Sequence, residues 1–283
     1  MLEIIDRLEE HCARVPVLET TYRLLKSFER RIRRKIKGSD PNALPRDFDP
    51  EFRAIHDACR PFTMTGPLRM FAMYQAVKYV AAAGIPGDIV ECGVWRGGSA
   101  MVAAMTLLKL NQTDRAIWLY DTYEGMTLPS AKDVDADGRS ALMRWNTEWA
   151  ATSKGDGAGS DWCYASLEEV RANVLSTGFP ESNLRFIKGK VEETIPRDAP
   201  DRIALLRLDT DWHDSTYHEL VHLFPRLSSP GILILDDYGS WKGAREATDK
   251  YFVEKGVPML FNRIDGAARI AIKTDYHQGT KNN

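Results

Sequence analysis

The sequence predicts an α/β fold built on a mainly parallel β-sheet, and three patterns support this prediction. From Phe62 onward, short apolar runs alternate with longer segments of helical periodicity. The apolar runs are nearly continuous, which is typical of strands buried on both faces of a parallel sheet. Near the C-terminus, Asp265 and Gly266 separate two short strand-like runs, and this pair is a hairpin signal. A closing hairpin should therefore add one antiparallel strand to a parallel sheet covered by helices.

The elements of this fold can be placed in order from their apolar periodicity and from the glycine and proline residues between them. Helices are expected over residues 67–83, 99–110, 166–176, 215–227 and 244–254. Strands are expected over residues 88–92, 116–120, 184–188, 203–208, 231–235, 258–263 and 267–273. Residues 124–160 are polar and rich in glycine, which favours a lid-like insertion outside the core. Residues 61–283 then form one domain.

Residues 1–60 are interpreted as an N-terminal helical extension. Leu24, Phe28 and Ile32 recur near helical spacing, beside a run of basic residues from Arg30 to Lys37. Such a run either binds an anionic partner or membrane surface, or forms a solvated helix face or a contact between subunits. Residues 38–50 include three prolines and are expected to form a linker or a bend.

Composition and charge narrow the class of protein. The 283 residues carry 38 basic and 40 acidic side chains, so no global basic field attracts nucleic acid or anionic lipid. The 4 cysteines lie far apart, which suits a reduced compartment. The first residues lack the basic and apolar regions of a signal peptide, and no apolar run approaches the about 20 residues of a membrane helix. We expect a cytoplasmic protein that binds neither nucleic acid nor a membrane.

A glycine-rich turn follows the first expected strand, between Glu91 and Ser99. Ligands of doubly wound sheets bind beyond the carboxyl ends of the strands, where glycines let the backbone approach them. The glycines at 93, 97 and 98 match neither the GxGxxG dinucleotide fingerprint nor a P-loop. Asp121 ends the second strand, at the position that usually binds a ribose hydroxyl. The turn therefore favours a ligand with a ribose and an ammonium group, and the alternative is a turn needed only for packing.

Acidic residues follow two further strands. Asp209 and Asp211 end one expected strand, and Asp236 and Asp237 end the next along the chain. If these strands are neighbours, the acids meet at the edge of the sheet that carries the glycine turn. Like charges so close need a cation, and an all-oxygen site favours Mg²⁺, Mn²⁺ or Ca²⁺ over zinc. The alternative is a set of solvated acids at the starts of loops.

One segment of the expected helix 215–227, HELVH, matches the HExxH pattern of zinc proteases, so a zinc hydrolase is the rival enzyme class. On a helical projection, His218 and His222 lie opposite the apolar stripe that contains Leu220 and Phe224. A surface pair with no obvious third ligand is a poor catalytic zinc site. The segment is therefore interpreted as a solvated helix face.

Two features of the insertion allow more than one interpretation. Residues 133–138 open like an EF-hand loop, but Arg144 occupies the position of the bidentate glutamate, which favours a polar loop over a calcium site. Trp145, Trp149 and Trp162 lie in or beside the insertion. They either stack on a sugar or an adenine ring, or hold the insertion in place.

Five segments carry a resemblance to a known family: PFTMT, GDIVECGVWRGGS, LYDTYEGM, LRLDTDWHDST and GILILDDYGSWKGAR. In this order they resemble the macrocin-type (TylF) family of S-adenosylmethionine-dependent O-methyltransferases, from about Pro61 to Phe252. The resemblance implies a class I methyltransferase fold, which is Rossmann-like. It also implies methyl transfer to a hydroxyl, of a sugar on a natural product or of a glycan, and a homo-oligomer.

The resemblance also implies roles for the residues at the strand ends. Those implied to bind S-adenosylmethionine are Thr65, Glu91, Gly93, Gly97, Gly98, Ser99 and Asp121. Those that match magnesium ligands are Asp209, Asp236 and Asp237. Asp209 is also the expected general base, because a sugar hydroxyl must lose its proton. A methyltransferase-fold protein that binds ligands without catalysis is the alternative outside the enzymes.

Overall fold

The computed structural model describes residues 44–150, 152 and 160–275, and from Asp47 onward they belong to one compact unit. The apolar stripe and the basic run expected between Leu24 and Lys37 lie outside the described residues. None of the helices in the described ranges is long and apolar enough to cross a membrane.

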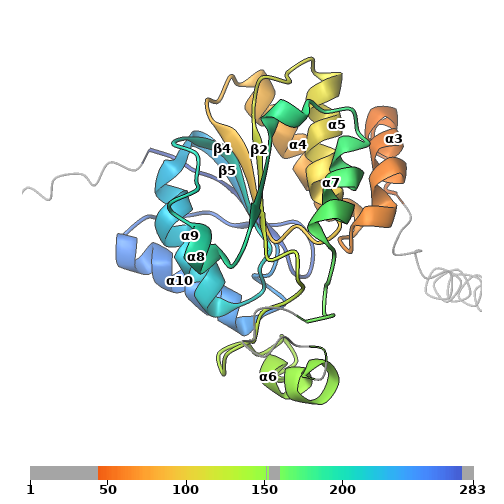
Figure 1. The fold of residues 1–283 in the computed structure, drawn as a ribbon. Helices are drawn as coiled ribbons and strands as arrows, with labels where there is room; N and C mark the ends of the chain where they lie inside the picture. Colours follow the sequence, from red (N-terminus) through yellow and green to blue (C-terminus); the bar gives the residue numbers. More distant parts are fainter. Residues whose placement is uncertain (1–43, 151, 153–159, 276–283) are drawn as a thin grey trace, which may run out of the picture. The chain divides into compact units, whose positions relative to one another are not determined.

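The core of the unit is a seven-stranded sheet in the order β3-β2-β1-β4-β5-β7-β6 (Figure 1). Strands β1 to β5 are parallel, and β7 runs antiparallel between β5 and β6. The strands are β1 (Asp88–Cys92), β2 (Ile117–Asp121), β3 (Leu184–Lys188), β4 (Ile203–Leu208), β5 (Leu227–Leu235), β6 (Asn262–Arg263) and β7 (Arg269–Ile272). The predicted fold class, a mainly parallel sheet closed by an antiparallel hairpin, is confirmed.

Helices cover both faces of this sheet, so the unit has three layers (Figure 1). Helices α3, α4, α5 and α7 lie on one face, and α8, α9 and α10 lie on the other. The longer helices are α3 (Pro50–Cys59), α4 (Pro67–Ala82), α5 (Gly98–Lys109), α7 (Leu167–Leu175), α9 (His213–Leu223) and α10 (Lys242–Lys255). The short ones are η1 (Arg60–Phe62), α6 (Ala141–Arg144), the π-helical turn η2 (Trp145–Trp149), η3 (Glu181–Asn183), α8 (Val191–Thr194) and η4 (Phe224–Arg226).

Strand β4 lies at the centre of the sheet, as expected from its apolar sequence. Its residues IALLRL are all buried, including its one charged residue, Arg207. The chain runs from β1 to β2 and β3 on one side, then returns to β4 and β5 on the other. A topological switch point therefore lies between β1 and β4, and ligands bind at the carboxyl edge of such a point.

Helix α3 belongs to the compact unit, although it precedes residue 61. The Asp49 carboxylate accepts a hydrogen bond from the Phe52 N–H at 2.7 Å, and Pro50 supplies the first helical residue, so the helix has a well-defined start. Phe52 and Ile55 are completely buried, and the helix packs against α4 and α5. Part of the sequence assigned above to the N-terminal extension thus contributes to the core.

Predicted and observed boundaries agree for β3 and β4 but differ at the end of α9. This helix ends at Leu223 rather than at residue 227, because Pro225 has no N–H group to continue α-helical hydrogen bonding. Strand β5 consequently begins at Leu227 rather than at residue 231. The predicted strand 258–263 is also too long, since β6 contains only Asn262 and Arg263.

The first half of the insertion is anchored to the beginnings of α9 and α10. The Asp133 carboxylate accepts the His213 N–H at 2.8 Å, and the Lys242 N–H donates to the Val134 carbonyl at 2.7 Å. The Asp135 carboxylate in turn accepts from the Arg139 Nε at 2.7 Å. These acids of the EF-hand-like segment therefore stabilise the loop itself, as expected for a polar loop.

Candidate active site

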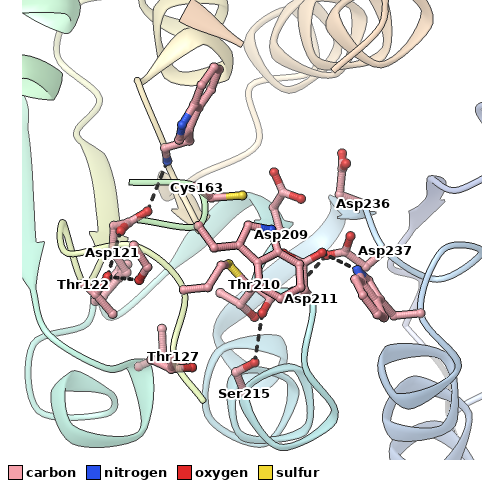
Figure 2. A pocket seen from close by; sticks show the side chains of 18 of the residues that line it. Asp121, Thr122, Thr127, Cys163, Asp209, Thr210, Asp211, Ser215, Asp236 and Asp237 are labelled. Carbon is pink, nitrogen blue, oxygen red and sulfur yellow. Dashed lines mark hydrogen bonds between the residues drawn. The ribbon is translucent and has the colours of Figure 1, made fainter. Parts of the chain in front are cut away.

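A cavity of about 380 Å³ opens at the carboxyl ends of β1, β2, β4 and β5. The predicted site residues that line it are Thr65, Gly93, Asp121, Asp209, Asp236 and Asp237. The predicted site residues that do not line it are Glu91, Gly97, Gly98 and Ser99. Figure 2 shows Asp121 on one side of this space and Asp236 and Asp237 on the other, with Asp209 between them. The cavity therefore has a side near the β1 turn and an acidic side.

The acidic side is formed by three carboxylates from neighbouring strands. Asp209 follows β4, and Asp236 and Asp237 follow β5, which is parallel to β4 and paired with it. One ligand atom from each of the three residues lies within 4.8 Å of the other two. Within the part of the chain that the structure describes, they form the only group of three or more potential metal ligands. The parallel register of β4 and β5 thus brings these acids together.

Two arginines, which the sequence analysis missed, contact the acidic cluster. Arg207 lies beneath it and pairs with Glu91, with Asp209 at 2.8 Å and with Asp236 at 2.8 Å. Arg69, from the first turn of α4, pairs with Asp236 and with Asp265. An arginine within the apolar run of β4 was a signal for a buried ion pair, whereas nothing in the sequence pointed to Arg69.

These arginines do not balance all the negative charge in the site. Burial raises the pKa of the Asp209 and Asp237 carboxyl groups well above their ordinary range, and the neighbouring charge of Asp236 adds to both shifts. Burial also raises the pKa of Glu91 to about 7, against the lowering effect of Arg207. An additional cation would therefore favour the ionised cluster, and three carboxylates with few other ligands suit a hard divalent ion.

A fourth acid, Asp211, lines the cavity beside the cluster. Its N–H donates to the Asp237 carboxylate at 3.1 Å, and its own carboxylate accepts from the Trp241 indole N–H at 2.5 Å. Its φ of +65° is left-handed, a conformation that aspartate adopts more readily than most residues. Burial, followed by the charge of Asp209, raises its pKa to about 7. The hydrogen bonds to Trp241 and Asp237 thus fix Asp211 at the wall of the cavity, next to the three-acid cluster but outside it.

Asp121 supports the turn after β1 as well as lining the cavity. Its carboxylate accepts N–H hydrogen bonds from Val94 at 2.7 Å, from Trp95 at 3.1 Å and from Tyr123 at 2.8 Å. Oδ2 accepts the first two of these bonds, and Oδ1 accepts the third and lies 3.4 Å from the Thr122 hydroxyl, which donates to the Gly125 carbonyl oxygen at 2.7 Å. One acceptor position therefore remains on Oδ1. The acid at the end of β2 therefore lies where a ligand hydroxyl can reach it.

The other residues that were predicted to bind S-adenosylmethionine pack behind the turn. Gly97 has a φ of +91° and lies against Val174 of α7. A Cβ atom at Gly98 would lie 2.6 Å from the Phe62 carbonyl oxygen, so only glycine fits there. Ser99 is buried in the first turn of α5, and Glu91 is buried against Arg207. These residues shape the turn from behind the cavity wall.

Replacing Gly97 by alanine should therefore affect stability rather than donor binding. A side chain in this left-handed conformation costs about 1–3 kcal/mol of the free energy of unfolding, measurable by urea denaturation. Calorimetry should show the affinity for S-adenosylhomocysteine, the product of the expected donor, little changed. Gly266→Ala is the control, because its Cβ atom would meet open space at an ordinary φ. Weaker binding without loss of stability would place Gly97 in contact with the donor.

Four tryptophans form a cluster at the acidic side: Trp149, Trp162, Trp212 and Trp241. Trp162 stacks on Trp149 at a centroid distance of 5.8 Å, and its edge meets Trp212 at 5.6 Å. Trp212 meets Trp241 at 5.0 Å, nearly at right angles. The cluster therefore joins the insertion to the β4–α9 loop and to the start of α10. Trp145 is buried separately.

The HELVH segment does not form a second site. The His218 ring is hydrogen-bonded to the Ile195 carbonyl oxygen at 2.9 Å, and Glu219 is completely buried, where it accepts from the Thr210 hydroxyl at 3.0 Å. The acid therefore points into the protein, away from the face of the two histidines. None of His218, Glu219 and His222 lines the cavity. The geometry gives no support to a zinc hydrolase.

Comparisons with known proteins agree with this geometry. A family model described as macrocin-O-methyltransferase (TylF) matches residues 19–271. A rhamnosyl-tetracenomycin-C 4'-O-methyltransferase from Streptomyces olivaceus is 32% identical over 231 residues, which are 82% of this chain and 81% of that protein. The mycinamicin III 3''-O-methyltransferase of Micromonospora griseorubida is 31% identical over 203 residues, with 72% and 75% of the two chains covered.

Solved structures of methyltransferases share this fold. The O-methyltransferase NovP superposes with a TM-score of 0.65 at 30% identity, over 75% of this chain and 82% of that chain. The calicheamicin methyltransferase CalS11 is more distant, with a TM-score of 0.53 at 18% identity over 84% and 98% of the chains, so it supports the fold alone. On the match over residues 19–271 and these similarities, the chain belongs to the macrocin O-methyltransferase (TylF) family of S-adenosylmethionine-dependent O-methyltransferases.

Proposed function

We propose that this protein methylates a hydroxyl group of a sugar on a natural product and that it requires a divalent cation, Mg²⁺. The observation that carries the proposal is the three-acid cluster at the cavity, beside the separate carboxylate Asp211. The names of the relatives support the acceptor class, since two of them act on a rhamnosyl tetracenomycin and on mycinamicin III. A third, 32% identical over 189 residues, acts on demethyldecarbamoylnovobiocin.

The cation would be held by Asp209, Asp236 and Asp237. Their three carboxylates offer oxygen ligands, and burial together with mutual repulsion favours a positive ion among them. A divalent cation there supplies positive charge beside the acceptor hydroxyl, which makes that hydroxyl easier to deprotonate. Arg207 holds Asp209 and Asp236 in place from below.

The donor would bind at the opposite side of the cavity. We assign the ribose to Asp121, whose carboxylate keeps free acceptor capacity, and the methionine part to the space next to Thr65 and Gly93. Glu91, Gly97, Gly98 and Ser99 would contribute indirectly, by fixing the turn behind this space. Donor and acceptor would then meet above Asp209, between the two sides.

We assign proton removal to Asp211 rather than to Asp209, the base expected from the sequence. Burial raises the pKa of Asp209, but Arg207 lowers it, and a cation held by the three acids would lower it further. With the cation bound, Asp209 would therefore be the weaker base. Asp211 takes the proton while the acceptor oxygen bonds to the donor's electrophilic methyl carbon and the carbon–sulfur bond breaks. The products are the methyl ether, S-adenosylhomocysteine and a protonated Asp211. Alignment of the two substrates adds to the rate.

The experiment that tests the proposal follows methyl transfer from labelled donor to a panel of glycosides, with and without metal. EDTA should lower turnover by about 100-fold or more, because stabilisation worth several kcal/mol is lost, and Mg²⁺ should restore it. S-adenosylhomocysteine should still bind in EDTA, because the metal and donor residues differ. Full turnover in EDTA would contradict the metal requirement, and transfer to non-sugar phenols alone would contradict the acceptor class.

The proposal also covers the cellular setting. We propose a cytoplasmic homo-oligomer that binds neither nucleic acid nor membrane, consistent with a formal charge of −2. Light scattering coupled to size-exclusion chromatography measures the subunit number directly.

A further inference from the structure

The loops that carry the catalytic acids are joined to each other at Trp241. Its backbone N–H donates to the Asp237 carbonyl oxygen at 3.0 Å, in the loop after β5. Its indole N–H donates to the Asp211 carboxylate at 2.5 Å, in the loop after β4. Asp211 completes the link, because its own N–H donates to the Asp237 carboxylate at 3.1 Å. The two loops therefore hold each other through one tryptophan.

The Trp241 ring has little freedom to turn. It is 8% exposed and meets the Trp212 ring at 5.0 Å and 76°, and the Trp162 ring at 6.4 Å and 57°. Trp212 is fixed in turn by a 3.1 Å hydrogen bond from its indole N–H to the Thr127 carbonyl oxygen. The donor of the hydrogen bond to Asp211 is thus held by packing from the insertion and from the β4–α9 loop.

We propose that Trp241 is a positioning residue, which aims the Asp211 carboxylate at the acceptor hydroxyl through its indole N–H. The inference depends on the proposed function, in which Asp211 removes the proton. Asp211 has a left-handed backbone, so its side-chain direction is not fixed by regular secondary structure, and a neighbour must supply that direction. The indole N–H bonds to Oδ1 of this carboxylate, and Asp211 is among the residues that line the cavity, next to Asp237.

Trp241→Phe is the informative variant, because it keeps an aromatic ring in the cluster and removes the indole N–H. Losing a hydrogen bond to a charged group should lower kcat by about 10–100-fold. The KM for the acceptor and the affinity for S-adenosylhomocysteine should change little, since the ring and the donor side remain. A purely structural role would instead lower the urea midpoint and leave kcat per folded molecule unchanged.

Trp118→Phe is the matched control. It also removes one indole N–H that donates to an aspartate, Asp88 at 2.9 Å, but neither residue lines the active-site cavity. We expect kcat close to that of the unchanged protein. Equal losses of kcat in the two variants, or an unchanged kcat in Trp241→Phe, would overturn the inference.

A double-mutant cycle with Asp211→Asn separates this inference from the proposed function. If Trp241 acts through Asp211, adding Trp241→Phe to Asp211→Asn should cause no further loss of kcat. Additive losses would reject the positioning role while leaving Asp211 as the base. An unchanged kcat in Asp211→Asn alone would reject the base assignment itself.

Discussion

Replacing Asp211 by asparagine is expected to lower kcat by about 10²–10⁴-fold, the contribution of a well-placed general base. The amide keeps the shape of the side chain and can still pair with Trp241, but it cannot take a proton from the acceptor. Binding of S-adenosylhomocysteine should persist, because Asp121 and the β1 turn are untouched. Steady-state kinetics at saturating donor and Mg²⁺, with calorimetry for the product, measure both quantities.

Asp214→Asn is the control for this substitution. Asp214 lies in the first turn of α9, close to Asp211 in sequence, but its side chain is 65% exposed and pairs with Lys132 and with the neighbouring His213 ring. None of Asp214, Lys132 and His213 lines the cavity. The variant should retain full activity, since exposed ion pairs contribute little. The assignment to Asp211 fails if Asp211→Asn turns over normally while Asp209→Asn, with Mg²⁺ still bound, does not. Asp209 would then be the base, as the sequence alone suggested.

Replacing Arg207 by methionine is expected to lower the free energy of unfolding by about 3–5 kcal/mol. The guanidinium is 4% exposed and pairs with three acids, so its removal leaves Glu91, Asp209 and Asp236 close together with one buried cation fewer. Methionine fills similar space, which separates the charge effect from the creation of a cavity. Urea denaturation in EDTA measures this loss without compensation by a metal ion.

Arg197→Met provides the comparison, since that arginine is 74% exposed and pairs with its sequence neighbour Asp198. Its effect should stay within about 0.5 kcal/mol. Arg207→Lys should fall between the two, because lysine keeps the charge but cannot contact all the acids with one planar group. If Arg207→Met is as stable as the unchanged protein, the ion-pair network is not a net source of stability.

The fold was largely predictable because it depends on local patterns. Buried parallel strands give short apolar runs, and β3 and β4 begin and end at the predicted residues. The acids at the ends of β4 and β5 could also be placed together, because parallel neighbours share an edge. The end of α9 was misplaced because the apolar periodicity continues through Phe224 and Leu227, although Pro225 interrupts the helix.

The side-chain contacts within the site could not be predicted in the same way. The pairs Arg69–Asp236 and Trp241–Asp211 join residues that are distant in sequence, and only the packed helices and loops bring them together. The glycine turn itself could be predicted, but the groups that contact its glycines could not. Gly98 looked like a residue that a ligand approaches, but the backbone that approaches it is that of Phe62, on the far side from the cavity. A glycine pattern shows that close approach is needed without showing what approaches.

The carboxylate of Asp121 has two roles: it accepts hydrogen bonds from the amides of Val94 and Trp95, and it lines the side of the cavity that we propose for the donor. A substitution at this position would therefore affect both roles together. Asparagine would weaken acceptance from the amides, and glutamate would displace the turn that they form. Evolution toward a different cofactor would therefore have to rebuild the β1 turn at the same time, which makes this corner of the molecule resistant to gradual change.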